Sequence, residues 1–174
     1  MAGNMFLALT NILGESMDVD HKMEIEIFEW TWGMSNSASF RLQESEAAKL
    51  TSVQNIVITK MFDKASTTLM NYCANGKKID EGTITCRKHG GGGGENVRPV
   101  EYLKIKIFGV KVDSITWGGR GEDIRGIPEQ VNLSFLRFEV RYEVQHRDGA
   151  LVGANVFDFD IPEQKAPAVA GAKK

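Results

Sequence analysis

The residues with the most obvious chemical potential are five consecutive glycines, which lie between His89 and Glu95. They are Gly90, Gly91, Gly92, Gly93 and Gly94. Glycine-rich loops can bind phosphate because their backbone N–H groups converge on an anion at the start of a helix. A P-loop would need Lys-Ser or Lys-Thr after the last glycine, and the dinucleotide pattern would need a third glycine where Glu95 stands. A strand pattern follows at 101–107 instead of a helix, so the five glycines are predicted to form a flexible hairpin loop between two strands.

The histidines and cysteines do not form a recognisable site. His21, His89 and His146 are far apart in the sequence and lack the spacing of metal ligands, so each is expected to be a polar surface or interface residue. Cys73 and Cys86 form no CxxC pair. A disulfide between them stays open at this point, and two buried free thiols are the favoured interpretation.

Motifs for hydrolysis and acid–base chemistry are also missing from the sequence. No Gly-x-Ser-x-Gly elbow is present. The carboxylate pairs Glu24/Glu26 and Glu122/Asp123 do not stand in a setting that hints at a raised pKa, so they are interpreted as solvated charges on a strand face or in a loop. The sequence thus predicts a protein that is not an enzyme, with no catalytic residue, no metal site and no cofactor.

The bulk composition is that of one ordinary globular domain. The 174 residues are 42% hydrophobic and 25% charged, and the formal net charge is -2. This balance gives no electrostatic reason to expect nucleic acid or an anionic membrane as a partner. The N-terminus has no signal-peptide pattern, and no window approaches the ~20 apolar residues of a membrane helix.

Alternating apolar residues predict that strands dominate the chain, but the alternation changes face within three segments, 21–32, 103–112 and 131–144. The first apolar sets are Met23/Ile25/Ile27, Leu103/Ile105/Ile107 and Val131/Leu133/Phe135, and the second sets are Phe28/Trp30/Trp32, Val110/Val112 and Leu136/Phe138/Val140. A straight strand does not tolerate such a slip, whereas a bulge or sharp bend does. The favoured fold is an all-β one, a small closed β-barrel of bent antiparallel strands with one flanking α-helix. Burial of both strand faces, one of them at a subunit contact, would also soften the pattern.

One helix is predicted after residue 63. Asp63 can cap its start, Gly76 suits the left-handed position after its end, and the apolar stripe between them consists of Ala65, Leu69, Tyr72 and Cys73. The barrel domain is expected to span residues 1–162. Residues 163–174 are rich in Ala, Pro and Lys and are predicted to be a disordered tail.

Several motifs together resemble one known family. They are Gly14-Glu15-Ser16, His21-Lys22-x-Glu24-Ile25-Glu26, Trp30-x-Trp32-Gly33-x-Ser35 and Glu101-Tyr102-Leu103-Lys104-Ile105. In this order, and with further matches up to Phe159, the sequence resembles the Hcp family, the haemolysin-coregulated proteins of bacterial type VI secretion systems.

The resemblance implies a β-barrel that assembles as a homo-hexameric ring, and stacked rings that form a hollow tube. It implies sheath, spike and effector proteins as partners, without nucleic acid binding or membrane insertion. It also implies assembly in the cytoplasm, secretion by the type VI system without a cleaved signal peptide, and a chaperone or carrier role for effectors in the ring lumen. The rival interpretation is a monomeric small-ligand-binding barrel.

The resemblance also assigns roles to residues. Trp30 and Trp32 are expected to pack the barrel, so Glu29 and Thr31 would face the lumen; the alternative is that Thr31 lines a subunit contact. The loop 36–51 would touch the next ring, through Ser39, Phe40, Arg41, Leu42, Gln43 and Glu44. Many family members carry a glycine run in that loop, whereas this chain has an acidic segment at 43–48.

Overall fold

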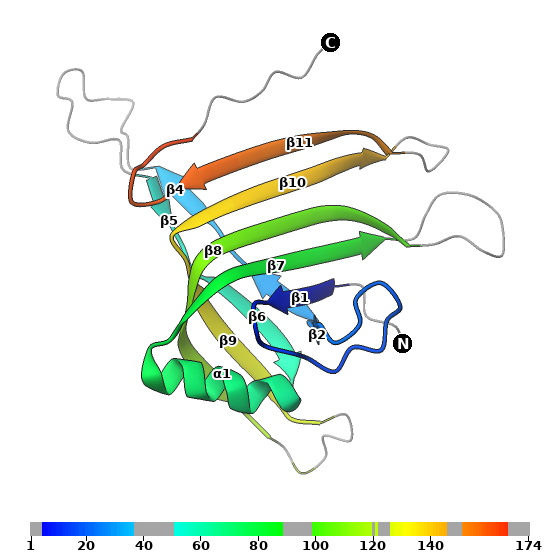
Figure 1. The fold of residues 1–174 in the computed structure, drawn as a ribbon, viewed down its shortest axis with the longest axis vertical. Helices are drawn as coiled ribbons and strands as arrows, with labels where there is room; N and C mark the ends of the chain where they lie inside the picture. Colours follow the sequence, from blue (N-terminus) through cyan, green and yellow to red (C-terminus); the bar gives the residue numbers. More distant parts are fainter. Residues whose placement is uncertain are drawn as a thin grey trace.

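The computed structural model describes residues 5–36, 51–88, 99–119, 121, 126–145 and 151–166. Figure 1 shows the strands and the single helix that these residues form. The elements are β1 Met5–Leu9, β2 Ile25–Glu26, β3 Glu29–Thr31, β4 Met34–Asn36, β5 Thr51–Val53, β6 Ile56–Met61, α1 Lys64–Asn75, β7 Lys78–Lys88, β8 Val100–Trp117, β9 Pro128–Ser134, β10 Arg137–Gln145 and β11 Leu151–Asp160. The predicted all-β class with one helix is confirmed.

The main sheet rolls into a barrel-like shape with the strand order β2-β1-β7-β8-β9-β6-β3. Its two ends are joined by the chain itself, because the segment 25–31 pairs first with β1 and then with β6. At the crossing, the Ile27 N–H donates to Met5 O (3.1 Å) and the Phe28 N–H donates to Thr59 O (2.8 Å). The prediction of one strand through 21–32 is therefore wrong. This segment contains two short strands, β2 and β3, which pair with opposite edges of the sheet.

The other two changes of apolar face also coincide with bends. β8 pairs with β7 on one side, and on the other side first with β10 and then, beyond Gly109, with β9. Gly109 has φ +64°, and a Cβ there would lie 3.0 Å from Leu136 Cδ1, so the position requires glycine. Between β9 and β10 the chain turns at Phe135 and Leu136, where the Leu136 N–H donates to Phe108 O (2.9 Å). Bends thus restore the inward position of most of each apolar set, as the sequence predicts, but Phe28 and Leu136, which lie at the changes of face, are exposed.

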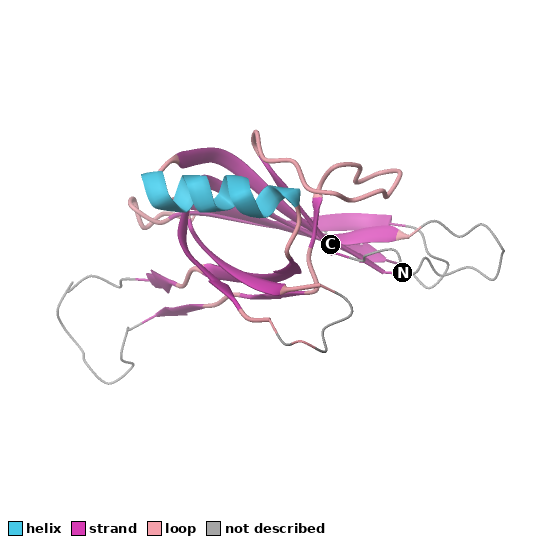
Figure 2. Cartoon of the chain, turned by 90° about the horizontal axis from the view of Figure 1, so that it is seen from below, coloured by secondary structure: helices cyan, strands magenta, loops and turns pink. Residues whose placement is uncertain are grey.

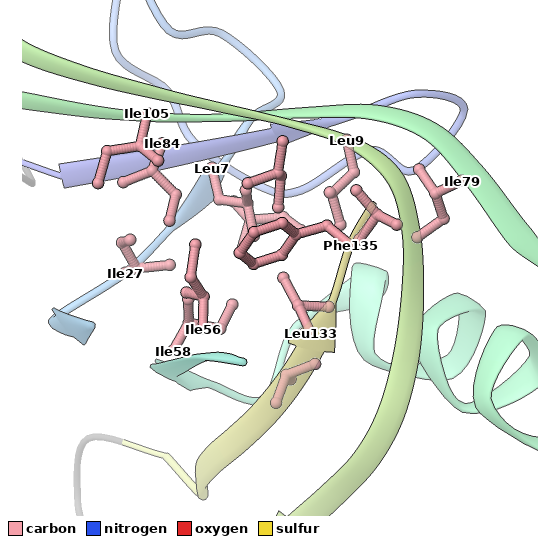
Figure 3. Close-up of a cluster of buried hydrophobic side chains, with 14 of the residues drawn as sticks. Leu7, Leu9, Ile27, Ile56, Ile58, Ile79, Ile84, Ile105, Leu133 and Phe135 are labelled. Atoms are coloured by element: carbon pink, nitrogen blue, oxygen red, sulfur yellow. The ribbon is translucent and has the colours of Figure 1, made fainter. Parts of the chain in front are cut away.

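Aliphatic and aromatic side chains fill the interior of the rolled sheet. Figure 3 shows Leu7, Ile58, Ile84, Ile105 and Leu133 pointing inward from five different strands. At one end of the core, the Phe138 ring lies 4.6 Å from Trp32, 5.8 Å from Phe157 and 5.9 Å from Phe159 between centroids. Trp30 and Trp32 both pack against this core, as predicted.

The helix α1 has the ends that the sequence predicts. The Asp63 side chain accepts the Ala65 N–H and shares a capping box with Ser66, and Gly76 follows the last turn with φ 59°. Ala65 and Leu69 are buried, and Figure 2 shows the helix lying across one side of the rolled strands. None of the helices in the described residues is long and apolar enough to cross a membrane.

The two cysteines are free thiols. Cys86 is buried, and burial raises the pKa of its thiol, which keeps it in the unreactive protonated form. Cys73 is only half-buried. Residues 161–166, part of which the sequence assigns to the tail, form a turn that the Gln164 side chain ties to Thr51.

Candidate binding face

The predicted lumen residues Glu29 and Thr31 lie on the outward side of four neighbouring strands. Directly paired residues in an antiparallel sheet point to the same side, so the register aligns two rows across β3, β6, β9 and β8. The first row is Glu29, Thr59, Gln130 and Thr116, and the second row is Thr31, Val57, Asn132 and Ser114. We call these eight residues the polar face. Their neighbours along the same strands, such as Trp30, Ile58 and Val131, point into the core.

The polar face carries hydroxyl and amide groups with very little charge. Glu29 is its only ionisable residue, and Val57 its only apolar one. Glu29, Thr31, Gln130, Ser114 and Thr116 are exposed, and the other three are half-buried. Apart from Glu29, the groups available are hydrogen-bond donors and acceptors that stay neutral at every physiological pH.

The outward side of the other half of the barrel has the opposite character. Across β8, β10 and β11, positively and negatively charged side chains are interspersed on this side. They include Lys104, Lys106, Arg137, Glu139, Arg141 and Asp158. Arg137 forms an ion pair with Asp158, and Arg141 Nε lies 2.6 Å from Glu143 Oε1. The Arg137 guanidinium lowers the pKa of Asp158 by hydrogen bonding, against the opposing effect of burial. The two halves thus offer surfaces suited to different partners.

One atom of the polar face lacks a partner within the described chain. The Asn132 Oδ1 atom is buried and accepts no hydrogen bond from the described residues. An unsatisfied buried acceptor costs free energy, about 1–3 kcal/mol. A water molecule or a group on a bound partner would remove this cost. The unpaired Asn132 Oδ1 atom therefore offers a hydrogen-bond acceptor to a water molecule or to a bound partner.

The arrangement supports binding rather than chemistry. The polar face holds no histidine, cysteine or lysine beside its hydroxyls, so it has no activated nucleophile. Among the residues that the structure describes, no group of three or more His, Cys, Asp or Glu side chains could hold a metal ion. Hydrogen bonds to neutral groups are what this surface can supply.

A second cluster, which the sequence did not predict, surrounds His21. His21 was expected at a surface or interface, but the residue is only 5% exposed, and its ring stacks on Phe6 with 4.3 Å between ring centroids. Its Nδ1 lies 3.0 Å from Glu24 Oε2, and its Nε2 lies 3.0 Å from Glu101 Oε1. The Arg87 guanidinium also packs on Phe6, at 4.6 Å from the ring centroid. This cluster fastens the 10–24 loop over the outer side of β1 and β7.

Two carboxylates of this cluster have lowered pKa values. The Arg87 hydrogen bonds lower the pKa of Asp18, helped by the backbone N–H groups of Asp20 and His21, although burial acts in the opposite direction. For Glu101, burial opposes ionisation most strongly, but Lys104 and His21 outweigh it and lower the pKa. Both carboxylates are therefore stabilised as anions by the fold. The cluster has the character of a structural clamp.

A third cluster is buried inside the barrel wall beside the start of α1. The Lys60 ammonium lies 2.8 Å from Asp63 Oδ1, 2.9 Å from Ser66 Oγ and 3.4 Å from Glu129 Oε2. Lys60 and Glu129 are fully buried, and the Ser66 hydroxyl lies 2.5 Å from Glu129 Oε2. A sequence signal for this cluster exists. The alternation of β6 and β9 puts Lys60 in line with Ile56 and Ile58, and Glu129 in line with Val131.

Of the site residues that the sequence predicts, Glu29 and Thr31 lie in the described part of the chain. Glu29 and Thr31 are brought together with six residues of other strands, which the sequence could not connect. Their lumen position remains a prediction.

Two predicted groups of residues lie outside the part of the chain that the structure describes. One is the glycine hairpin loop, which consists of Gly90, Gly91, Gly92, Gly93 and Gly94. The other is the predicted stacking group, which consists of Ser39, Phe40, Arg41, Leu42, Gln43 and Glu44. The roles of both groups therefore remain predictions.

Comparison with known proteins identifies the family. The family model described as "Type VI secretion system effector, Hcp" matches residues 6–142 of this chain. The chain belongs to the Hcp family. Protein hcp1 of Pseudomonas aeruginosa is 39% identical over 156 residues, which cover 90% of this chain and 93% of that protein. The resemblance seen in the sequence motifs is thereby confirmed.

Solved Hcp structures have the same fold. Hcp1 from Salmonella typhimurium is 31% identical, has a TM-score of 0.73, and covers 95% of this chain and 99% of its own. A further type six secretion system protein has a TM-score of 0.84 with the same two coverages, but at 19% identity it supports the fold alone. This Hcp chain is thus a tube protein of a type VI secretion system, of the kind that the system secretes.

Proposed function

We propose that this Hcp protein assembles as a homo-hexamer, and that its rings stack into the hollow inner tube of a type VI secretion system. In this proposal the tube forms in the cytoplasm inside a sheath, carries a spike, and leaves the cell without a cleaved signal peptide. The ring also carries effectors in its lumen. The role is structural, and the protein catalyses no reaction of its own.

The observation that carries this proposal is the free edge of β11. Among the strands that the structure describes, β11 (Leu151–Asp160) pairs only with β10, so its other edge is free except at Asp160, which forms an isolated bridge with Lys165. An unpaired edge of this length is a template for pairing with another chain. When identical head-to-tail contacts repeat with a suitable rotation, they close into a ring.

The two outward faces of the barrel fit different positions in such a ring. A lumen that holds effectors of varied charge is best lined by neutral hydrogen-bonding groups, and the polar face supplies them. The charged side of β8, β10 and β11 suits partners outside the ring. We therefore assign the polar face, with Glu29 and Thr31, to the lumen.

The rival function is a monomeric barrel that binds a small ligand. The interior of the rolled sheet is filled by packed aliphatic and aromatic side chains (Figure 3), so the barrel centre is a core rather than a binding cavity. This packing favours the assembly proposal over an interior ligand site.

Size-exclusion chromatography with light scattering tests the proposal, together with negative-stain microscopy. We expect a mass near six times the 19.3 kDa of one chain, and hollow rings or tubes in the images. Val156→Lys places a charge on the β11 edge strand and should shift the mass toward the monomer. Val19→Lys, at a valine that is 93% exposed away from this edge, is the matched control. A strict monomer under all conditions would reject the ring and favour the rival.

A further inference from the structure

The loop 10–24, which connects β1 to β2 (Figure 1), carries a histidine with a carboxylate at each of its ring nitrogens. His21 Nδ1 lies 3.0 Å from Glu24 Oε2 in the same loop, and Nε2 lies 3.0 Å from Glu101 Oε1 on β8. A neutral imidazole has only one N–H, so favourable contacts at both nitrogens require the protonated ring. The geometry therefore fits the imidazolium form. We call these three residues the His21 clamp.

The contact between His21 and Glu101 depends on charge. The Nε2 atom is buried, and no group of the described residues accepts a directed hydrogen bond from it. Its interaction with Glu101 Oε1 at 3.0 Å is therefore an ion pair, which requires a protonated ring. Of the two contacts, this is the one that reaches another element. It is thus the contact that joins the loop to the sheet.

Other charged groups surround the clamp on the elements packed against it. Asp18 of the loop accepts the His21 backbone N–H, Arg87 of β7 packs on Phe6 as His21 does, and Lys104 of β8 contacts Glu101. Glu26 of β2 is paired with Phe6, and β1 itself contributes no charged side chain. Asp20 and Lys22, the neighbours of His21 in the chain, are exposed.

Two carboxylates around the ring keep their charge at ordinary pH. Arg87 lowers the pKa of Asp18. For Glu101, burial acts most strongly and against ionisation, but Lys104 and His21 outweigh it and lower the pKa. Histidine is the side chain whose charge normally changes between about pH 5 and 8, and both carboxylates stay anions there. A change of charge at the contact between the loop and β8 therefore falls on His21.

The closed loop holds a strained backbone beside the clamp. Met23 has φ +64°, a left-handed conformation that is uncommon for residues other than glycine. Its N–H donates to Ser16 O (2.9 Å), and its carbonyl accepts the Gly14 N–H (2.7 Å). A Cβ at Gly14 would lie 2.2 Å from Glu24 O, so the two sides of the loop are in close contact. Such a conformation persists only where surrounding contacts enforce it, and the clamp is one of them.

We propose that the His21 clamp holds the 10–24 loop closed while the ring is protonated, and releases the loop when the ring loses its proton to solvent. Release uncovers Phe6, which is fully buried in the closed form. It also alters one wall of a groove of about 330 Å³, which Ser16 and Met17 of the loop help to line. The inference concerns neither the polar face nor the edge of β11, so it goes beyond the proposed function.

Hydrogen exchange of the full chain, followed by mass spectrometry between about pH 5 and 8, tests the inference. Amide exchange in peptides that cover 10–24 is divided by the intrinsic rate at each pH, and exchange of the His21 ring C–H reports its protonation in the same samples. We expect protection of the loop to fall about tenfold as the ring loses its proton, the scale of one hydrogen bond to a charged group. A peptide that contains Phe62, whose N–H donates to Ile127 O outside the clamp, is the internal control.

Two variants separate the clamp from other effects of pH. His21→Gln cannot carry the charge, so its loop should have low protection at every pH and show no step. Glu101→Gln keeps the histidine and removes the carboxylate beside Nε2, so the step should become smaller. Asp80→Asn, at an exposed aspartate of β7, is the matched control and should behave as the unaltered chain does.

The inference is overturned if loop protection stays constant across this range, whether the ring keeps its proton or loses it. A step that persists in His21→Gln would assign it to another group and would overturn the inference as well. If His21→Gln does not fold, the unaltered chain and Glu101→Gln still decide. Light scattering measures ring formation separately, so failure of the clamp leaves the ring proposal intact, and failure of the ring leaves the clamp intact.

Discussion

Lys60 Nζ lies 3.4 Å from Glu129 Oε2 within the barrel wall, and neither side chain is exposed to solvent. Ser66 and Asp63 complete the network, which links β6, β9 and the first turn of α1. The network therefore holds the helix against the barrel at the end where its capping box lies.

Removing the cation of this network should be costly. Lys60→Met leaves the Glu129 carboxylate buried without its partner, which should reduce the free energy of unfolding by about 3–5 kcal/mol. The double variant Lys60→Met/Glu129→Gln leaves no lone charge and should recover part of the loss. Urea unfolding measures both. Lys111→Met, at an exposed lysine of β8, is the control, and equal effects at 60 and 111 would contradict the network.

The Asp18–Arg87 ion pair should make stability depend on pH in the acid range. Folding lowers the pKa of Asp18 from 3.8, chiefly through Arg87, so the pair stabilises the fold above 3.8 and loses this contribution as the pH falls through the lower folded value. Asp18→Asn should be less stable than the natural chain at neutral pH, and the gap should narrow below 3.8. Urea unfolding across this range measures the gap. A gap that stays constant with pH would show that the ionisation of Asp18 contributes nothing.

Gly109→Ala should destabilise the bend of β8. Alanine at φ +64° costs about 1–2 kcal/mol, and its Cβ would also lie 3.0 Å from Leu136 Cδ1. Thermal or urea unfolding should show this loss. Gly118→Ala is the matched control, because a Cβ there would meet nothing within 4 Å. Equal stability of the two variants would mean that the bend does not depend on the left-handed conformation.

Labelling can locate Thr31 in the assembled tube. A Thr31→Cys chain in a Cys73→Ser background should react with a small maleimide in both rings and tubes, because Thr31 is exposed. In stacked tubes it should resist a maleimide joined to a large polyethylene glycol, which a lumen excludes. Lys106→Cys, on the charged side, should react with both reagents. Equal reaction of Thr31→Cys with the large reagent would place Thr31 outside the lumen.

Cargo retention gives an independent measure of the polar face. Thr31→Trp should leave the ring mass unchanged and reduce the amount of an effector that co-purifies with the ring. Because the face binds through neutral groups, retention by the unaltered ring should change little with salt concentration. Unchanged retention in Thr31→Trp, or rapid loss with added salt, would contradict hydrogen bonding at this face.

The features that the sequence predicted correctly depend on local signals. Asp63 and Gly76 mark the ends of α1 through backbone geometry that neighbouring residues determine. The three bends are visible because a change of apolar face along one strand has few physical solutions. The helix caps and the changes of apolar face can both be recognised without knowing which strands are neighbours in the sheet.

The candidate site was harder to predict because it depends on register. Thr31, Asn132 and Ser114 share one row only because β3, β6, β9 and β8 pair in that order and alignment. Nothing in the local sequence states that order. Lys60 and Glu129 were detectable as charges at inward positions, although their pairing was not. The burial of His21 depends on the 10–24 loop folding over Phe6, and the spacing of apolar residues in the sequence does not reveal how a loop folds.

The crossing of the 25–31 segment has a consequence for how the barrel opens. Everywhere else the wall is held by ladders of paired strands, but here a few hydrogen bonds of one segment, among them those of Ile27 and Phe28, join the two edges. The 25–31 segment is therefore the place where the fewest backbone hydrogen bonds must break before the rolled sheet can open. We expect amide exchange at Ile27 and Phe28 to be faster than at Ile84 and Ile105 in the middle of the sheet.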